Sequence, residues 1–334
     1  MSQILVTGAS GYVGTQLVAA LLRRGSDGGG QQPVRAVVRS AAREDGLRAA
    51  MRRAPGLENS AGDANIEVVT ADLMSGDAWK AAMAGVDEVY HVASPIPPAQ
   101  PEDPDELVVP AREGTLRVLR AARDAGARRV VLTSSFAAIG YTPKPGAEFT
   151  EGDWTDPDMP GLPPYPRSKT IAERAAWDFM RSEGGGTELV VANPTFILGP
   201  PLTDEAGSSM YLIKAMFDGT MSVAPRHRFG IADVRDVADL HVRAMAAPGA
   251  AGKRFIGVSD HPAMSYLELA EILRQRFGPL AARVPTEEAP GDDLPRLVIH
   301  NDRAKDELGW RPRPVETTIV DTVESLRGWG ELPE

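Results

Sequence analysis

The sequence predicts an α/β protein with a doubly wound parallel sheet, and three features of the chain point to this fold class. Short apolar runs alternate with helical stretches through the first half of the chain. The runs ILV, AVV and RVVL are apolar without alternation, as expected for parallel strands that are covered on both faces. A glycine-rich turn joins the first apolar run to the first helical stretch. Repeated strand–helix–strand units of this kind build a sheet with helices on both sides.

The strands and helices of the core are expected to alternate along the chain. We expect strands at Gln3–Thr7, Val34–Arg39, Ile66–Thr70, Val86–Val92, Arg129–Ser134 and Glu188–Ala192. We expect helices at Tyr12–Arg24, Ala41–Arg53, Asp77–Ala84, Asp105–Ala125 and Tyr165–Arg181. A proline begins the last of these helices, where its missing N–H has no helical partner in any case. Residues 1–193 are therefore assigned to the core domain.

The second part of the chain follows a looser pattern. Helices are expected at Ser209–Asp218, Val234–Ala246 and Val315–Gly328, and a strand at Arg254–Val258. The sequence SYLE at residues 265–268 reads as a capping box that begins another helix. We expect residues 194–334 to form mostly a smaller lobe, interleaved with the sheet, from which a segment at about 230–260 returns to the core.

The composition excludes several classes of function. A net charge of −10 and a pI near 5.2 disfavour binding to nucleic acid or to an anionic membrane. The chain has no cysteine, and its five histidines show no metal-ligand spacing, so we expect no disulfide and no metal site. No apolar run approaches the ~20 residues of a membrane helix, and the first residues enter a strand without room for a signal peptide. We expect a cytoplasmic protein, monomeric or homodimeric.

The segment VTGASGYVG, residues 6–14, connects the first strand to the first helix. Gly8 permits a tight turn, Gly11 lets the backbone approach a pyrophosphate, and Gly14 lets the helix pack closely on the strand. The N–H groups at the start of the helix then face the anion. A glycine-rich turn without a ligand is the alternative, but the position of the motif favours a dinucleotide site of a Rossmann-type fold. The residues expected to bind there are Gly8, Ser10, Gly11, Tyr12, Val13 and Gly14.

The end of the second strand favours NADP(H) over NAD(H). An NAD site usually has an acidic residue here, which binds the ribose 2′-hydroxyl. This chain has Arg39 instead, with Arg43 one turn later, and a guanidinium suits a 2′-phosphate. A solvated arginine at a strand end is the alternative, and NAD(H) is kept as a second cofactor. The ends of the third and fourth strands are also expected beside the cofactor, through Asp72, Leu73, Val92, Ala93 and Ser94.

A tyrosine and a lysine, Tyr165 and Lys169, lie four residues apart in a predicted helix and therefore on one face of it. The fifth strand ends in Ser134 and Ser135, at the edge where open α/β sheets bind ligands. Hydride transfer to a carbonyl builds negative charge on its oxygen, which a protonated tyrosine neutralises. A free phenol has a pKa near ~10, and a nearby ammonium is expected to lower it.

We therefore predict that Tyr165 is the general acid and that Lys169 both lowers its pKa and binds the nicotinamide ribose. Ser135 is expected to hydrogen-bond the carbonyl oxygen. An exposed surface pair would be the better interpretation of YPRSK alone, but the glycine turn and the serine pair favour catalysis.

With these motifs the chain resembles the extended short-chain dehydrogenase/reductase family over nearly its whole length. The segments that carry the resemblance are TGASGYVG, HVASP, LTSS, YPRSK, NPTFILGP and DVRDVADLHVRAM. It looks most like the branch of dihydroflavonol reductases, cinnamoyl-CoA reductases and microbial aldehyde or ketone reductases. The resemblance implies an NADPH-dependent reductase with Ser135, Tyr165 and Lys169 as its catalytic set and Ser134 beside the cofactor. It also implies a substrate-binding C-terminal lobe, and further cofactor contacts from Pro194, Thr195, Phe196 and Ser209.

Two other functions use the same cofactor site. Nucleotide-sugar epimerases and dehydratases of this family resemble one another in an acidic residue where Arg39 stands and an asparagine at the place of Phe196. Both departures favour the reductase. A redox-sensing protein that binds NADP without catalysis would be expected to have a broken tyrosine–lysine pair, and this pair is intact.

The expected substrate is a small hydrophobic carbonyl compound, an aldehyde or a ketone. Apolar and aromatic residues fall in the segments that should border the nicotinamide, although core packing is the alternative for each one. The candidates are Pro95, Ile96, Phe136, Tyr141, Met210 and Tyr211, together with Phe196.

Overall fold

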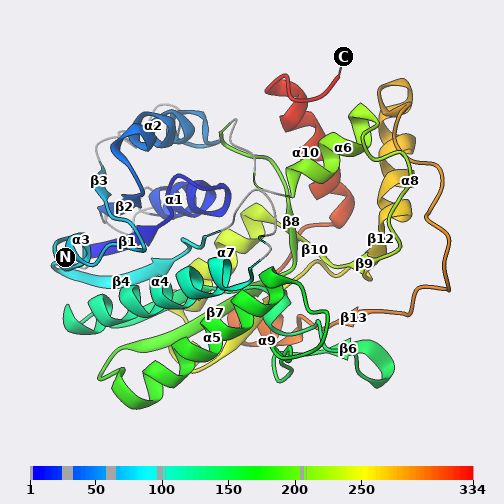
Figure 1. Ribbon diagram of the computed structural model, residues 1–334. Coiled ribbons are helices and arrows are strands. Elements are labelled where there is room, and N and C mark those ends of the chain that lie inside the picture. Colours follow the sequence, from blue (N-terminus) through cyan, green and yellow to red (C-terminus); the bar gives the residue numbers. More distant parts are fainter. Residues whose placement is uncertain are drawn as a thin grey trace.

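The computed structural model describes residues 3–24, 33–57, 65–95, 101, 103–203, 207 and 209–333. Its centre is a seven-stranded sheet in which every pairing is parallel, in the order β3-β2-β1-β4-β5-β7-β11 (Figure 1). The strands are β1 Gln3–Thr7, β2 Val34–Val38, β3 Ile66–Thr70, β4 Val86–His91, β5 Arg129–Thr133, β7 Glu188–Pro194 and β11 Arg254–Gly257. The strand order reverses between β1 and β4, as in a doubly wound sheet, so the predicted fold class is confirmed.

Helices cover both faces of the sheet (Figure 1). Alternate residues of β1 explain the two layers, because Ile4 and Val6 point into one buried cluster and Leu5 into the other. The first cluster packs on α1 (Tyr12–Arg24), α2 (Glu44–Arg53), α7 (Val234–Ala246) and α9 (Asp302–Leu308). The second packs on α3 (Asp77–Ala82), α4 (Asp105–Asp124) and α5 (Pro164–Glu183).

A smaller lobe lies beside the carboxyl edge of the sheet and has its own hydrophobic core (Figure 1). Its strands form pairs: β8 (Phe196–Leu198) with β10 (Ile231–Asp233), and β9 (Arg228–Phe229) with β12 (Met264–Ser265). Its helices are α6 (Met210–Asp218), α8 (Tyr266–Phe277) and α10 (Val315–Gly328). The predicted capping box at the start of α8 is present, since Glu268 N donates to Ser265 Oγ and Ser265 N donates to Glu268 Oε2.

The chain passes between the two parts more than once. Strand β11 and helix α7 follow residue 194 but belong to the sheet layers. A further pairing joins β6 (Glu148–Phe149) to β13 (Val298–Ile299), beneath the lobe in Figure 1. The predicted division at residue 193 stays a prediction.

Two expected absences were checked in the described part of the chain. No helix there combines the length and the apolar character that crossing a bilayer requires. The same residues contain no group of three or more His, Cys, Asp or Glu side chains arranged to hold a metal ion.

Candidate active site

The glycine turn between β1 and α1 leaves no room for side chains. Gly8 has a φ of +64°, and a Cβ there would lie 2.9 Å from the backbone of Ala93. A Cβ on Gly14 would lie 2.0 Å from the carbonyl oxygen of Gly8, so only glycine allows α1 to approach β1 this closely. Gly11 is exposed at the mouth of the turn, where the first N–H groups of α1 have no partner within the helix. This geometry suits a bound pyrophosphate.

The turn is braced by contacts from the neighbouring strand and from the lobe. Thr7 Oγ1 accepts hydrogen bonds from the backbone N–H groups of Val92 and Ala93, at 3.1 and 3.0 Å. The Tyr12 hydroxyl donates to the carbonyl of Gly199 at 2.7 Å, which ties the start of α1 to the lobe. The cradle is therefore fixed on both sides.

Arg39 follows β2 and its side chain is exposed. Among the described residues, none forms a hydrogen bond or an ion pair with its guanidinium, so this cation is available to an anionic ligand. Arg43 lies one turn further on and is partly exposed. The carboxylate of Asp72, after β3, accepts the backbone N–H of Met74 at 2.7 Å and shapes the local turn.

Ser135 and Tyr165 meet at the carboxyl edge of the sheet. Ser135 follows β5, and its Oγ accepts the N–H of Ala137 at 3.1 Å, capping a short 3₁₀ turn. Tyr165 stands in the first turn of α5, and the Ser135 side chain lowers the pKa of its phenol through hydrogen bonding. The serine that was predicted to place a carbonyl oxygen thus lies beside the predicted proton donor.

Lys169 is buried one helical turn after Tyr165. Its Nζ donates to Ser94 Oγ at 3.0 Å and lies 5.8 Å from the centroid of the Tyr165 ring. A narrow pocket is lined by Lys169 together with Ser94 and Ser134. The Oγ of Ser134 is buried without a hydrogen-bond partner in the described residues, so it is an unused polar group facing the expected cofactor site.

The electrostatics of the pair differ from the expectation. Burial raises the pKa of Tyr165, and the hydrogen bond with Ser135 acts in the opposite direction. Burial lowers the pKa of Lys169 to about 8, while the charge of Glu173 opposes that fall. The group that lowers the tyrosine pKa in this structure is Ser135. The ammonium of Lys169 donates its hydrogen bond to Ser94.

The sequence of this chain matches a known protein family. The family model described as "NAD dependent epimerase/dehydratase family" matches residues 4–256. The chain belongs to this family.

Relatives within the epimerase/dehydratase family include "Cinnamoyl-CoA reductase 1" of Arabidopsis thaliana, which is 33% identical over 98% of this chain and 90% of that protein. The structure of the yeast methylglyoxal/isovaleraldehyde reductase complexed with NADPH has a TM-score of 0.81 and 26% identity, covering 99% of this chain and 100% of that one. Vestitone reductase from alfalfa shares the fold, with 22% identity, a TM-score of 0.77 and coverage of 99% and 100%. The predicted extended short-chain dehydrogenase/reductase branch, and with it the NAD(P)-dependent oxidoreductase class, is confirmed.

Other predicted cofactor residues lie near the same edge of the sheet, but several of them pack or form hydrogen bonds within the protein. Pro194 is buried at the end of β7, and Thr195 Oγ1 donates to the carbonyl of Gly257 at 3.2 Å. Phe196 packs in the lobe core. The Ser209 hydroxyl donates to the carbonyl of Ile197, so its proton is not available to a diphosphate in this structure. Leu73 packs against Gly114 of α4.

The predicted substrate residues do not line one common surface of the site. Met210 is fully buried in the lobe core, and Phe136 packs edge-on against Phe149, so both serve packing. Tyr211 is 65% exposed. Pro95 is partly exposed after β4, and Ile96 lies outside the described residues. Tyr141 is 38% exposed and lies close to the site, because its pKa is raised by partial burial and also by the charge of Tyr165.

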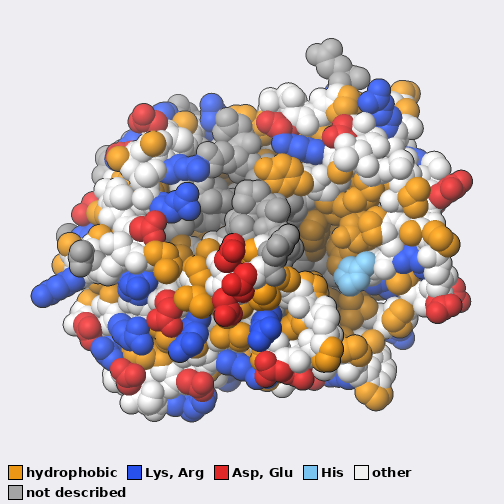
Figure 2. Space-filling model, in the orientation of Figure 1, with side chains coloured by type: hydrophobic (Ala, Val, Ile, Leu, Met, Phe, Trp, Pro, Cys, Tyr) orange, Lys and Arg blue, Asp and Glu red, His pale blue; other side chains and the backbone are white. Residues whose placement is uncertain are grey.

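Two aromatic residues of the lobe, Tyr266 and Phe229, were not predicted from the sequence. Tyr266 is the second phenol that acts on the pKa of Tyr141. Its ring centroid lies 4.8 Å from that of Phe229, which in turn lies 5.1 Å from that of Phe196. Figure 2 shows hydrophobic side chains in a hollow over the region where Figure 1 places β8, β9 and β12. The position of Tyr266 directly after the N-cap Ser265, at the partly exposed start of a helix, was the available signal.

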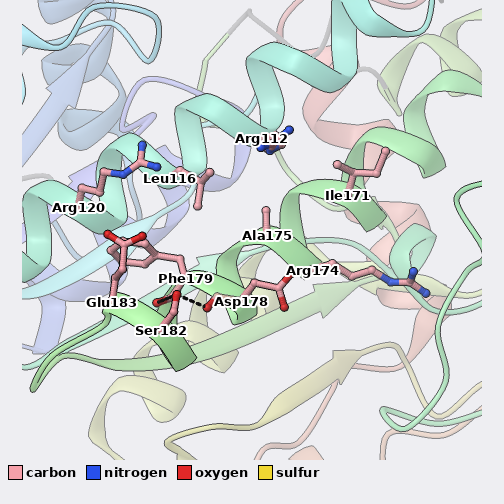
Figure 3. A pocket seen from close by; sticks show the side chains of 10 residues that line it. All are labelled: Arg112, Leu116, Arg120, Ile171, Arg174, Ala175, Asp178, Phe179, Ser182 and Glu183. Carbon is pink, nitrogen blue, oxygen red and sulfur yellow. Dashed lines mark hydrogen bonds between the residues drawn. The ribbon is translucent and has the colours of Figure 1, made fainter.

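A separate groove lies between α4 and α5, away from the predicted site residues (Figure 3). Arginine, acidic and apolar side chains from both helices line it. None of the predicted catalytic or cofactor residues is among them, so the groove takes no part in the site described above.

Proposed function

We propose that this protein is an NADPH-dependent reductase that transfers a hydride to the carbonyl of a hydrophobic aldehyde or ketone, with Tyr165 as the general acid. The observation that carries the proposal is that Ser135 acts on the Tyr165 phenol at the sheet edge, one helical turn from Lys169, whose Nζ donates to Ser94 just after β4. A proton donor, a carbonyl-binding hydroxyl and a cation thus share the end of the sheet with the glycine cradle.

The residues present fit NADPH. The cradle of Gly8, Gly11 and Gly14 would hold the diphosphate, and Arg39 would pair with the 2′-phosphate. The unpaired Oγ of Ser134 and the ammonium of Lys169 would meet the nicotinamide half. When bound, NADPH would supply the hydride that reaches the carbonyl carbon. Two of the similar solved structures contain NADPH, which supports this choice.

The chain's own residues handle the proton. Ser135 Oγ donates a hydrogen bond to the carbonyl oxygen and holds it next to the phenol. The O–H of Tyr165 gives its proton to that oxygen as negative charge develops there, so the product is an alcohol. The raised pKa of Tyr165 keeps the phenol protonated, as a donor must be, across the neutral range. Lys169, one helical turn from Tyr165, supplies a positive charge to the pocket that would receive the nicotinamide half.

The lobe supports a hydrophobic substrate. Phe196, Phe229 and Tyr266 form an aromatic row in the lobe, and both Tyr266 and Tyr165 lie near enough to Tyr141 to act on its pKa. Such rings favour an apolar or aromatic substituent on the carbonyl compound.

A screen of NADPH oxidation tests the proposal. Absorbance of NADPH is followed with aryl aldehydes, alkyl aldehydes and ketones, each with and without the protein. We expect turnover with one or more hydrophobic carbonyls and slower turnover with NADH. No oxidation of either cofactor across the panel, by folded protein that binds NADPH, would contradict the reductase assignment.

A further inference from the structure

A buried carboxylate stands one turn beyond Lys169 on the catalytic helix. Glu173 follows Lys169 by four residues and Tyr165 by eight, so the three side chains lie along one face of α5. Its side chain is 1% exposed, and it lines the same narrow pocket as Lys169. Buried charges of this kind are retained only when other groups hold them.

Three residues from other positions hold the Glu173 carboxylate. Arg254 of β11 places its Nε 2.6 Å from Oε1, as an ion pair by distance, although this N–H does not point along the contact. Trp177 donates its indole N–H to the same oxygen at 3.2 Å. Asn193 of β7 donates from Nδ2 to Oε2 at 2.8 Å. The carboxylate is therefore fixed in place on several sides.

The same network reaches the catalytic serine. The Nδ2 group of Asn193 also donates to the backbone carbonyl of Ser135 at 3.1 Å. Arg254 in turn is held by the carbonyls of Glu151 and Asp153, at 3.0 and 2.6 Å, and its guanidinium lies 3.8 Å from the ring centroid of Trp154. The cation and the carboxylate thus form a rigid unit behind the site.

We infer that Glu173 is a positioning residue for the reaction, whose fixed negative charge holds the Lys169 side chain in its ammonium form. The inference rests on the proposed function, which gives that ammonium its task. Burial favours the neutral amine, and the charge of Glu173 opposes burial. Without the carboxylate, Lys169 would lose its proton at lower pH and the site would lose its cation.

The other groups around Lys169 do not supply this charge. Tyr165 on α5 carries a raised pKa and is neutral, and His91 on β4 has its pKa lowered to about 3 by burial and by Lys169. The remaining residues that line the pocket with Lys169 come from α4, α5, β5 and the segments after β4 and β5, and they are uncharged: Ala93, Ser94, Ala111, Thr115, Leu132, Thr133, Ser134 and Ala172. Glu173 is therefore the anion that faces Lys169 among the described residues.

The test is a direct titration of Lys169 by NMR. The chain has six lysines, so protein labelled with carbon-13 at the lysine ε-carbon gives few signals. Loss of one signal in Lys169→Arg assigns that of Lys169. We expect its midpoint near pH 8 in the wild type, well below the ~10.4 of an exposed lysine. In Glu173→Gln the midpoint should fall by about one pH unit, the scale for removing a contacting opposite charge.

Two matched variants separate the effect of the Glu173 charge from the effect of a less rigid side-chain network. Glu173→Asp keeps the anion, and Arg254→Lys keeps the cation while losing the contacts with Trp154 and the backbone carbonyls. Both should titrate near the wild-type midpoint. If Glu173→Gln does not fold, the double change Glu173→Gln with Arg254→Gln leaves no unpaired buried charge. Its midpoint should also fall, but by less, because the loss of the Arg254 cation acts in the opposite direction. A midpoint unchanged in the folded Gln variant, or lowered equally in Arg254→Lys, would overturn the inference.

The outcome is independent of the activity screen. The titration uses protein without substrate. If the midpoint shifts in Glu173→Gln but the protein reduces no carbonyl, only the proposed reaction is contradicted. If the protein is an active reductase and its Lys169 midpoint does not change in Glu173→Gln, only the positioning role is contradicted.

Discussion

The Nζ of Lys169 on α5 donates a hydrogen bond to Ser94, just after β4, at 3.0 Å. This contact directs the ammonium toward the segment that follows β4, and it leaves Nζ 5.8 Å from the centroid of the Tyr165 ring. Burial also lowers the pKa of Lys169 to about 8, whereas it raises that of Tyr165. As the pH rises, Lys169 is therefore the first of the two groups to lose its proton.

This order predicts the basic limb of the pH–rate profile. In the wild type, kcat/KM for carbonyl reduction should fall as the pH rises through about 8, because the site loses its cation. Lys169→Arg keeps the positive charge at every accessible pH, so its limb should move upward, whatever its absolute rate. Lys169→Met should bind the cofactor more weakly and reduce carbonyls more slowly. An Arg variant whose limb stays at the wild-type position would contradict the assignment.

Arg39 should set the choice of cofactor. Arg39→Asp removes the partner of a 2′-phosphate and places a carboxylate where a ribose 2′-hydroxyl is held. The ratio of NADPH to NADH affinity should fall about tenfold or more, since a hydrogen bond to a charged group contributes about 1.5–3 kcal/mol. Arg296→Asp makes the same charge change at another exposed position and should leave the ratio unchanged. If the wild type binds NADPH and NADH equally well, Arg39 does not select the cofactor.

The aromatic row should govern substrate size. Phe229→Ala removes a ring that contacts both Phe196 and Tyr266, so it should raise KM for an aryl aldehyde several-fold, by the ~0.5–1.5 kcal/mol of an aromatic contact. The kcat should change little, because the ring contributes to binding before and during the reaction. A short alkyl aldehyde measured in parallel serves as the control and should show a smaller effect. An equal loss on both substrates would speak against a binding role.

Two buried histidines should make the fold sensitive to mild acid. Burial lowers the pKa of His91 to about 3 and that of His241 to about 4, against ~6.5 in the unfolded chain. Their neutral forms stabilise the fold fully above pH 6.5, and this stability is lost as the pH falls toward the folded values. Urea denaturation should give a free energy of unfolding lower at pH 5 than at pH 7, by roughly 2 kcal/mol for each histidine. His241→Gln should remove about half of that difference, and an unchanged difference would contradict the argument.

The sequence predicted the sheet and the tight glycine turn after β1 closely, and physical reasons explain why. The parallel strands are buried on both faces and read as continuous apolar runs, and Gly8 and Gly14 stand where any Cβ would collide with backbone. Ser135, Tyr165 and Lys169 could be found because the end of a strand and one helix face bring them together.

Features that depend on contacts distant in sequence were not predicted. Glu173 resembles any polar residue of a helix until Arg254 and Asn193 are seen on it. Met210 and Tyr211 are neighbours in the chain, yet one is buried in the lobe core and the other is exposed, because the helix turns them to opposite sides. Short strands such as β9 and β12 have only two residues each and leave no periodic signal.

The reaction of Tyr165 is the central claim, and one paired measurement tests it most directly. The turnover of Tyr165→Phe with NADPH and the best carbonyl substrate is compared with that of the wild type, and NADPH affinity is measured by titration on the same samples. Removing the phenol hydroxyl deletes a proton donor and no cofactor contact, so turnover should fall on the order of 10²–10⁴-fold while NADPH affinity stays nearly unchanged. A Phe variant that retains wild-type turnover would contradict the account.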